Sequence, residues 1–295
     1  MRPNWAKVWL FYGLTFVITH GTSMAYVLAG GTWGDPTSYV VANILMLCPA
    51  VVAVLLQSLV FRKPLARTLG LRFRPNGWFV LAWLLPPLVM CAALGFTLLL
   101  PGATFAADMS GLPSEMDAFR AQVTSLGLPP FIGMLVVGLL LGPSLNAIGG
   151  LGEEIGWRGF LYEELATLGF WRCSLLTGAL WALWHVPMLL EGGYGDREHP
   201  VASAAGTLAF AVLLAPILHL VRERSGSVVA CGILHGTMSS TRLISVAFAR
   251  GAGPWSNAAI PVMLLAVSAA MSRIFVRAAS IAPTLAPANS PVDSA

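Results

Sequence analysis

Long apolar runs separated by short polar connections dominate the sequence. A helix needs about 20 apolar residues to cross a hydrocarbon core of roughly 30 Å, and several runs approach or exceed that length. This pattern predicts an all-α protein, a polytopic transmembrane helical bundle with about eight spans. The predicted spans cover residues 8–30, 39–61, 77–101, 130–152, 174–190, 201–221, 226–248 and 256–272.

Composition narrows the class of protein further. Apolar residues make up 57% of the 295 residues and charged residues only 10%, whereas a soluble domain carries about 25% charged residues. These values exclude a soluble globular domain, a disordered chain, a coiled coil and a nucleic-acid-binding protein. The four cysteines lie in or beside apolar stretches without CxxC spacing, which predicts buried thiols rather than a disulfide framework.

The basic residues predict an orientation. With the N-terminus in the cytoplasm, thirteen Lys and Arg residues fall on the cytoplasmic side and only Arg120, Arg197 and Arg250 fall outside, which satisfies the positive-inside rule. Both termini are then cytoplasmic. We predict one transmembrane domain over residues 1–279, and a disordered cytoplasmic tail over 280–295, which is rich in Pro, Ala and Ser. Scarce Lys beside abundant Ala, Gly and Arg suggests a GC-rich genome, which favours a prokaryotic plasma membrane as the location.

The first cluster of ionisable residues lies at the predicted inner end of the fourth span. Glu154 and Arg158 are i,i+4 neighbours in the favourable order, while Glu153 is turned about 100° away. We predict that Arg158 holds Glu154 and that Glu153 stays free to exchange a proton. Glu153 should lie at the inner boundary, shallower than His185, unless a helix bend at Pro143 draws it inward. The alternative is a charge cluster that merely ends a span.

Two further clusters lie in later spans. His185 falls near the predicted middle of the fifth span, with Trp181 one turn away as a pocket wall. His235, Ser239 and Arg242 form one stripe of hydrogen-bond donors in the seventh span. Each cluster alone has a structural alternative, namely a buried hydrogen-bonding His or polar contacts between helices. Together they suggest a hydrolase, in which a carboxylate activates water and donors receive the oxyanion.

These clusters resemble the motifs of the CAAX-prenyl protease and bacteriocin-processing family of intramembrane endopeptidases. EExxxR is met by Glu153, Glu154 and Arg158, FxxxH by His185 with Trp181 in place of Phe, and His-xxx-Asn/Asp by His235 with Ser239 at the amide position. The resemblance covers about residues 145–240 and includes all three motifs in order.

The resemblance implies a glutamate-dependent peptidase without an obligatory metal or other cofactor. Glu153 and His185 would activate the attacking water, Glu154 and Arg158 would support the site, and His235 with residue 239 would polarise the scissile carbonyl. Ser239 can donate one hydrogen bond but lacks the NH₂ pair of Asn. The expected partners are membrane lipid and a peptide or protein substrate, lipidated or not, reached from a site that opens to the cytoplasm.

Three alternatives remain at this point. A zinc-dependent peptidase would use Glu153, His185 and His235 as ligands, although the sequence has no HExxH motif. A non-catalytic immunity or scaffold protein would retain the fold, with Ser239 marking lost chemistry. A transporter would use Glu153, Glu154 and His185 as a proton relay.

Overall fold

The computed structural model describes residues 2–192, 200–251, 259–271 and 273. The predicted all-α class is confirmed, since the described strands are one antiparallel pair of two residues each. The predicted tail, 280–295, lies outside the described residues. The elements in chain order are α1 (Trp5–Leu28), α2 (Pro36–Leu55), η1 (Leu56–Val60), α3 (Leu65–Thr68), α4 (Gly77–Leu98), β1 (Thr104–Phe105), η2 (Ser114–Met116), α5 (Asp117–Thr124), α6 (Pro130–Leu141), η3 (Gly142–Asn146), α7 (Ala147–Glu154), η4 (Ile155–Leu161), α8 (Tyr162–Leu165), η5 (Ala166–Leu168), α9 (Phe170–Leu190), α10 (Pro200–Ser225), α11 (Val228–Thr241), α12 (Ile244–Ala247), β2 (Ala249–Arg250) and α13 (Ala259–Met271).

Several of these helices are long and apolar enough to cross a membrane. Within the described part of the chain, five helical stretches meet both conditions, which supports a multi-pass membrane protein; the count of eight spans stays a prediction. The five stretches are Pro36–Val60, Gly77–Leu98, Pro130–Leu168, Phe170–Leu190 and Pro200–Ser225.

The predicted end of the fourth span is wrong. The chain does not leave the helix at Glu153 and Glu154, because α6, η3, α7, η4, α8 and η5 follow one another from Pro130 to Leu168. Glu153 is only 2% exposed and Glu154 is fully buried. A hydropathy pattern treats adjacent acids as the end of a span. Here both acids have polar partners on other helices, so the helix continues past them.

The predicted span over residues 226–248 is not one continuous helix. Helix α11 has 14 residues and ends at Thr241, and the separate short helix α12 follows. After α12 the chain pairs β2 with β1, so that Ala249 and Arg250 lie opposite Phe105 and Thr104. The long loop that follows α4 is thereby fixed beside the end of α12.

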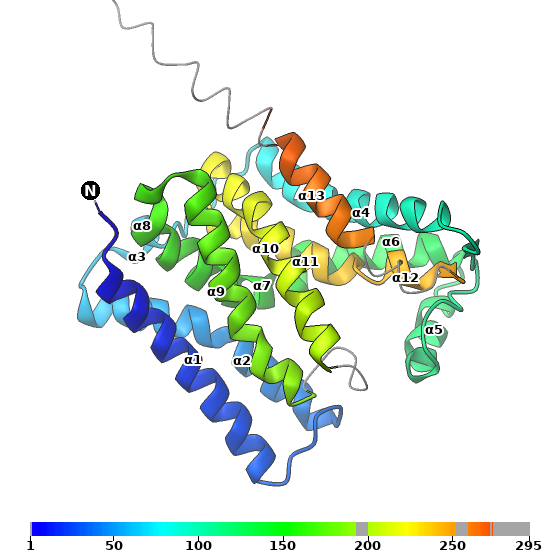
Figure 1. Cartoon of the computed structure of the whole chain (residues 1–295), viewed down its shortest axis with the longest axis horizontal. Helices are drawn as coiled ribbons and strands as arrows, with labels where there is room; N and C mark the ends of the chain where they lie inside the picture. The colour runs from blue at the N-terminus through cyan, green and yellow to red at the C-terminus, as the bar shows by residue number, and fades with distance from the viewer. Residues whose placement is uncertain (1, 193–199, 252–258, 272, 274–295) are drawn as a thin grey trace, which may run out of the picture.

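Helix α11 lies inside the bundle. It contacts α7, η3, α4, α6 and α10, while α9 packs along α10 and α2 packs along α7. Figure 1 shows α1 and α2 on one flank, α4 and α6 on the other, and α9 and α10 across the middle. The turn into α11 uses Gly226, whose φ of +68° favours glycine, and Ser227, whose Oγ accepts from the N–H of Val229 at 3.1 Å.

Glycines allow α7 and α11 to approach closely. A methyl group built on Gly150 would lie 2.9 Å from the carbonyl oxygen of Gly232. One built on Gly236 would lie 2.5 Å from the carbonyl oxygen of Gly142 and 2.6 Å from the carbonyl carbon of Asn146. Small residues at helix interfaces are typical of membrane bundles, where close packing drives association. This contact sets the distance between the acids of α7 and His235 of α11.

Candidate active site

Glu153 meets two side chains of α9. Its Oε2 accepts a hydrogen bond from the indole Nε1 of Trp181 at 2.6 Å and lies 3.8 Å from Nε2 of His185. Trp181 and His185 are one turn apart on α9, so a single helix face presents both groups. The deep carboxylate and the imidazole therefore lie at the same level, which corrects the prediction that Glu153 is the shallower group.

Glu154 is held from two directions. Its Oε1 accepts from Nη1 of Arg158 at 3.0 Å, the predicted i,i+4 pair, and lies 2.9 Å from Nδ1 of His235 on α11. Arg158 and Glu154 are 1% and 0% exposed at their side chains. A buried charge needs such a partner, because leaving it unpaired costs several kcal/mol. Nδ1 of His235 is thus engaged by Glu154, and the Nε2 edge of the ring lies outside this pair.

Trp181 connects the two halves of the cluster. Its ring centroid lies 5.8 Å from that of His185 and 5.5 Å from that of His235. The guanidinium carbon of Arg158 lies over the same ring, 4.7 Å from its centroid. The sequence suggested only an aromatic wall at this position. The signal it contained was the indole N–H, a donor that the Phe of the family motif lacks.

The cluster is closed at one end. Trp157, Phe160 and Leu161 of η4 are fully buried, and Phe11 of α1 packs against two of them, 5.6 Å from Trp157 and 4.8 Å from Phe160 between ring centroids. Glu154 Oε2 and Arg158 Nη2 are buried here without a protein partner among the described residues. Ordered water usually satisfies buried polar atoms of this kind.

Side chains are more exposed at the opposite end. The side chain of His185 is 15% exposed, and exposure rises along α11 from His235, which is 8% exposed, to the exposed residues Ser239 and Arg242. Asn146 of η3 is exposed at the same end. Side-chain exposure therefore increases from the cluster towards the C-terminal end of α11.

The structure brings together five of the six predicted site residues. Glu153, Glu154, Arg158, His185 and His235 are joined by the contacts described above, whereas Ser239 makes no side-chain hydrogen bond to them. The exposed Arg242 lies seven residues beyond His235 on α11, or about 10 Å along the helix.

Asn146 is a residue that the sequence reasoning missed. Its Nδ2 donates to Oγ of Ser240 at 2.7 Å. Asn146, Gly150 and Glu153 share one helix face by their spacing of four and three residues. That spacing was the available signal, but the predicted cluster began only at Glu153.

The zinc alternative finds no support in this arrangement. Across the described ranges, no group of three or more His, Cys, Asp or Glu residues has the spacing needed to hold a metal ion. Glu153 faces His185, but His235 turns its Nδ1 to Glu154. The cysteines are free, and Cys48, Cys173 and Cys231 are buried as predicted.

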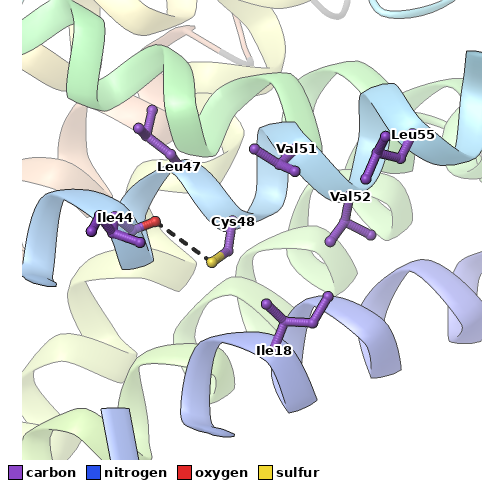
Figure 2. Close-up of a pocket in the computed structure, with 7 residues that line it drawn as sticks. All are labelled: Ile18, Ile44, Leu47, Cys48, Val51, Val52 and Leu55. Carbon is purple, nitrogen blue, oxygen red and sulfur yellow. Dashed lines mark hydrogen bonds between the residues drawn. The ribbon is translucent and has the colours of Figure 1, made fainter. Parts of the chain in front are cut away.

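An apolar groove between α1 and α2 is separate from this cluster. It encloses about 280 Å³ and is lined by Ile18 of α1 and by residues of α2 (Figure 2). Its one polar hydrogen is the thiol of Cys48, which donates to the carbonyl of Ile44 at 3.5 Å. The groove therefore offers hydrocarbon contacts and no acid–base chemistry. Its lining residues are Ile18, Ile44, Leu47, Cys48, Val51, Val52 and Leu55.

Comparison with known proteins points to one family. Residues 135–241 match the family model described as Type II CAAX prenyl endopeptidase Rce1-like, about a third of the chain. A protein named CAAX prenyl protease 2, from Methanococcus maripaludis, is 40% identical over 38 residues, which are 12% of this chain and 14% of that relative. The segment that supplies Glu153, His185 and His235 is thus similar to the type II CAAX prenyl endopeptidases, as the three motifs indicated.

Proposed function

We propose that the protein is an intramembrane endopeptidase that hydrolyses a peptide bond with water activated by Glu153. The observation that carries this proposal is the convergence of two carboxylates, two imidazoles and one guanidinium from η4, α7, α9 and α11. Ionisable side chains inside a membrane protein are costly, and such clusters are usually functional. The similarity to type II CAAX prenyl endopeptidases supports the same reaction class.

In the proposed reaction, a water molecule lies beside Glu153 and His185. The 3.8 Å separation of Glu153 Oε2 and His185 Nε2 leaves room for a water oxygen about 2.8 Å from each. Glu153 takes a proton from this water as the water oxygen attacks the scissile carbonyl carbon. The proton then passes to the leaving amine as the carbon–nitrogen bond breaks.

The other residues hold charge and position. Arg158 and His235 both contact Glu154 Oε1, so Glu154 fixes the imidazole of His235 beside the reacting carbonyl. The Nε2 edge of His235 then faces the developing oxyanion, where a preorganised donor lowers the barrier most. Arg158 neutralises Glu154 and lies over Trp181, which orients Glu153.

Replacing Glu153 with Gln tests this function. The amide is nearly isosteric but cannot accept the proton, so we expect loss of peptide cleavage by the purified protein with an unchanged melting temperature. Glu163→Gln is the matched control, because Glu163 is an exposed acid of the same helical stretch, and it should cleave as wild type does. Cleavage by Glu153→Gln at the wild-type rate would refute the proposal.

The non-catalytic and transporter alternatives predict different outcomes. A scaffold or immunity protein would keep its cellular effect in the Glu153→Gln variant. A proton-coupled transporter would show uptake in vesicles that Glu153→Gln abolishes, without cleavage of any peptide.

We propose a membrane-associated peptide as substrate and the prokaryotic plasma membrane as location. The relative from Methanococcus maripaludis is named as a prenyl protease, so matched peptides with and without a prenyl group at a Cys are the first substrates to compare. Cleavage of the prenylated peptide alone would establish lipid recognition. Equal cleavage of both would show that the peptide itself is recognised.

A further inference from the structure

The surface between η3 and the C-terminal half of α11 lies one helical turn from the proposed reaction centre. Gly150 packs against His235, since a methyl group built on it would lie 3.1 Å from Cβ of His235. Asn146 is one turn before Gly150 on the same face, and its backbone contacts Gly236, the residue after His235. Asn146 therefore lies beside Gly236, the neighbour of His235, at the more exposed end of the cluster.

The carboxamide of Asn146 is held in a defined orientation. The hydroxyl of Ser240 donates its proton to the carbonyl of Gly236 at 2.7 Å, so its oxygen accepts the hydrogen bond from Asn146 Nδ2 at 2.7 Å. This direction of donation identifies the amide atom that faces Ser240 as nitrogen. An amide nitrogen carries two hydrogens, and within the described structure the second one has no protein partner.

The segment that carries Asn146 is unusual for a helix interior. Residues Gly142–Asn146 form a π-helical turn that begins beside Pro143, and such turns are frequent at functional sites. Asn is also a weak helix former, so its presence lowers the intrinsic stability of this helical segment. Asn146 is exposed, lies near the proposed active site, and presents its second amide hydrogen as a donor.

Among the polar groups at this end, Asn146 carries the carboxamide whose orientation is fixed against α11, the helix of His235. Arg242 follows the end of α11, about 10 Å along the helix axis from His235, and is exposed. Ser239 offers a single hydroxyl on an exposed side chain. A developing oxyanion is stabilised best by two or more fixed donors.

We propose that Asn146 is a further catalytic residue that donates its second amide hydrogen to the oxyanion beside His235, in place of the amide that residue 239 lacks. The inference rests on the proposed peptidase function. Ser240 acts as the positioning residue, because its hydroxyl fixes the carboxamide.

The test is a rescue experiment on the full-length protein in detergent or lipid. Asn146→Ala should lower kcat by about 10²–10³-fold, the usual cost of one oxyanion donor, with little change in KM. Adding Ser239→Asn to Asn146→Ala should restore at least about tenfold of kcat, because the amide then comes from α11 instead. Ser144→Ala is the matched control, since Ser144 lies in the same π-helical turn and its hydroxyl donates to the carbonyl of Leu140 on its own helix.

Each outcome separates the possibilities. A kcat for Asn146→Ala equal to that of Ser144→Ala overturns the inference. A loss of kcat in Asn146→Ala that Ser239→Asn does not restore also overturns it, because an amide at residue 239 would not rescue a purely structural contact to Ser240. If Asn146→Ala does not fold, Ser240→Ala releases the amide, and its loss of kcat must be rescued in the same way. A wild-type protein that cleaves no peptide refutes the proposed function itself, whereas wild-type cleavage unaffected at Asn146 refutes only this inference.

Discussion

The indole N–H of Trp181 is the shortest polar contact made by Glu153, at 2.6 Å. A hydrogen bond to an ionised carboxylate contributes about 1.5–3 kcal/mol, roughly twice a neutral one. The same bond fixes the rotamer of the buried Glu153 side chain. At this residue, stability and the orientation of the proposed base therefore depend on one donor.

Replacing Trp181 with Phe removes the donor and keeps an aromatic ring. We expect the free energy of unfolding to fall by about 1–3 kcal/mol and kcat to fall by tenfold or more, on the order expected for a displaced reacting group. Denaturant unfolding and peptide cleavage measure the two effects.

Trp184→Phe is the matched control for this prediction. Trp184 lies on the same helix, and its indole donates to the hydroxyl of Thr19 at 3.1 Å rather than to the carboxylate. It should lose stability but keep far more of kcat. Equal losses of kcat in both variants would show that the N–H of Trp181 does not orient Glu153.

At the scale of elements, the contact between α7 and α11 determines whether Glu154 and His235 can meet. Gly150, Gly232 and Gly236 bring the two backbones together, and Glu154 then reaches His235 at 2.9 Å. Residues with larger side chains would separate the helices, and a hydrogen bond of this length does not survive a displacement of 1 Å.

Gly236→Ala tests that packing. The added methyl group collides with backbone atoms of η3 and α7, which cannot move aside as a flexible side chain could. We expect a loss of about 1–3 kcal/mol or more in the free energy of unfolding and a large fall in cleavage.

Gly95→Ala in α4 is the control for that variant, because a methyl group built there has no atom within 4 Å. It should be neutral or slightly stabilising, since Ala is the better helix former. Thermal unfolding in detergent compares the two. If Gly236→Ala were as stable and active as Gly95→Ala, the close packing would not be what holds the site together.

At the scale of the whole molecule, two predictions conflict. One is a cytoplasmic N-terminus, and the other is a site that opens to the cytoplasm. The more exposed side chains near the cluster lie at the end of α11 followed by Arg242. Arg72 lies close to the other end, since the N–H of Val228 bonds to the carbonyl of Gly70. The positive-inside rule places Arg72 in the cytoplasm. With this orientation, an opening at the end near Arg242 faces away from the cytoplasm. A cytoplasmic N-terminus and a cytoplasmic opening at this end therefore exclude each other.

Cysteine labelling decides between them. In a Cys91→Ala background, the remaining native thiols are buried. We expect Arg72→Cys and Arg242→Cys to react with a membrane-impermeant thiol reagent from opposite sides in intact cells or oriented vesicles, with Arg72→Cys reacting from the cytoplasm. Reaction of Arg72→Cys from outside would reverse the orientation and restore the cytoplasmic opening.

The sequence by itself determined the helical class, the membrane environment and the identity of the clustered acids and histidines. Apolar length and scarce charge leave few other solutions for a chain of this composition. The pairing of Arg158 with Glu154 was readable for the same reason, because an i,i+4 contact depends only on helix geometry.

Contacts between helices were decided only by the tertiary structure. Whether Glu153 ends a span or lies deep within a bundle depends on Trp181 and His185 of α9, and local hydropathy cannot register partners so far away in the chain. The same holds for Asn146, whose position beside Gly236 and Ser240 follows from glycines on α7 and α11 that allow two backbones to touch. Short-range periodicity fixes which residues share a helix face, whereas packing fixes which faces meet.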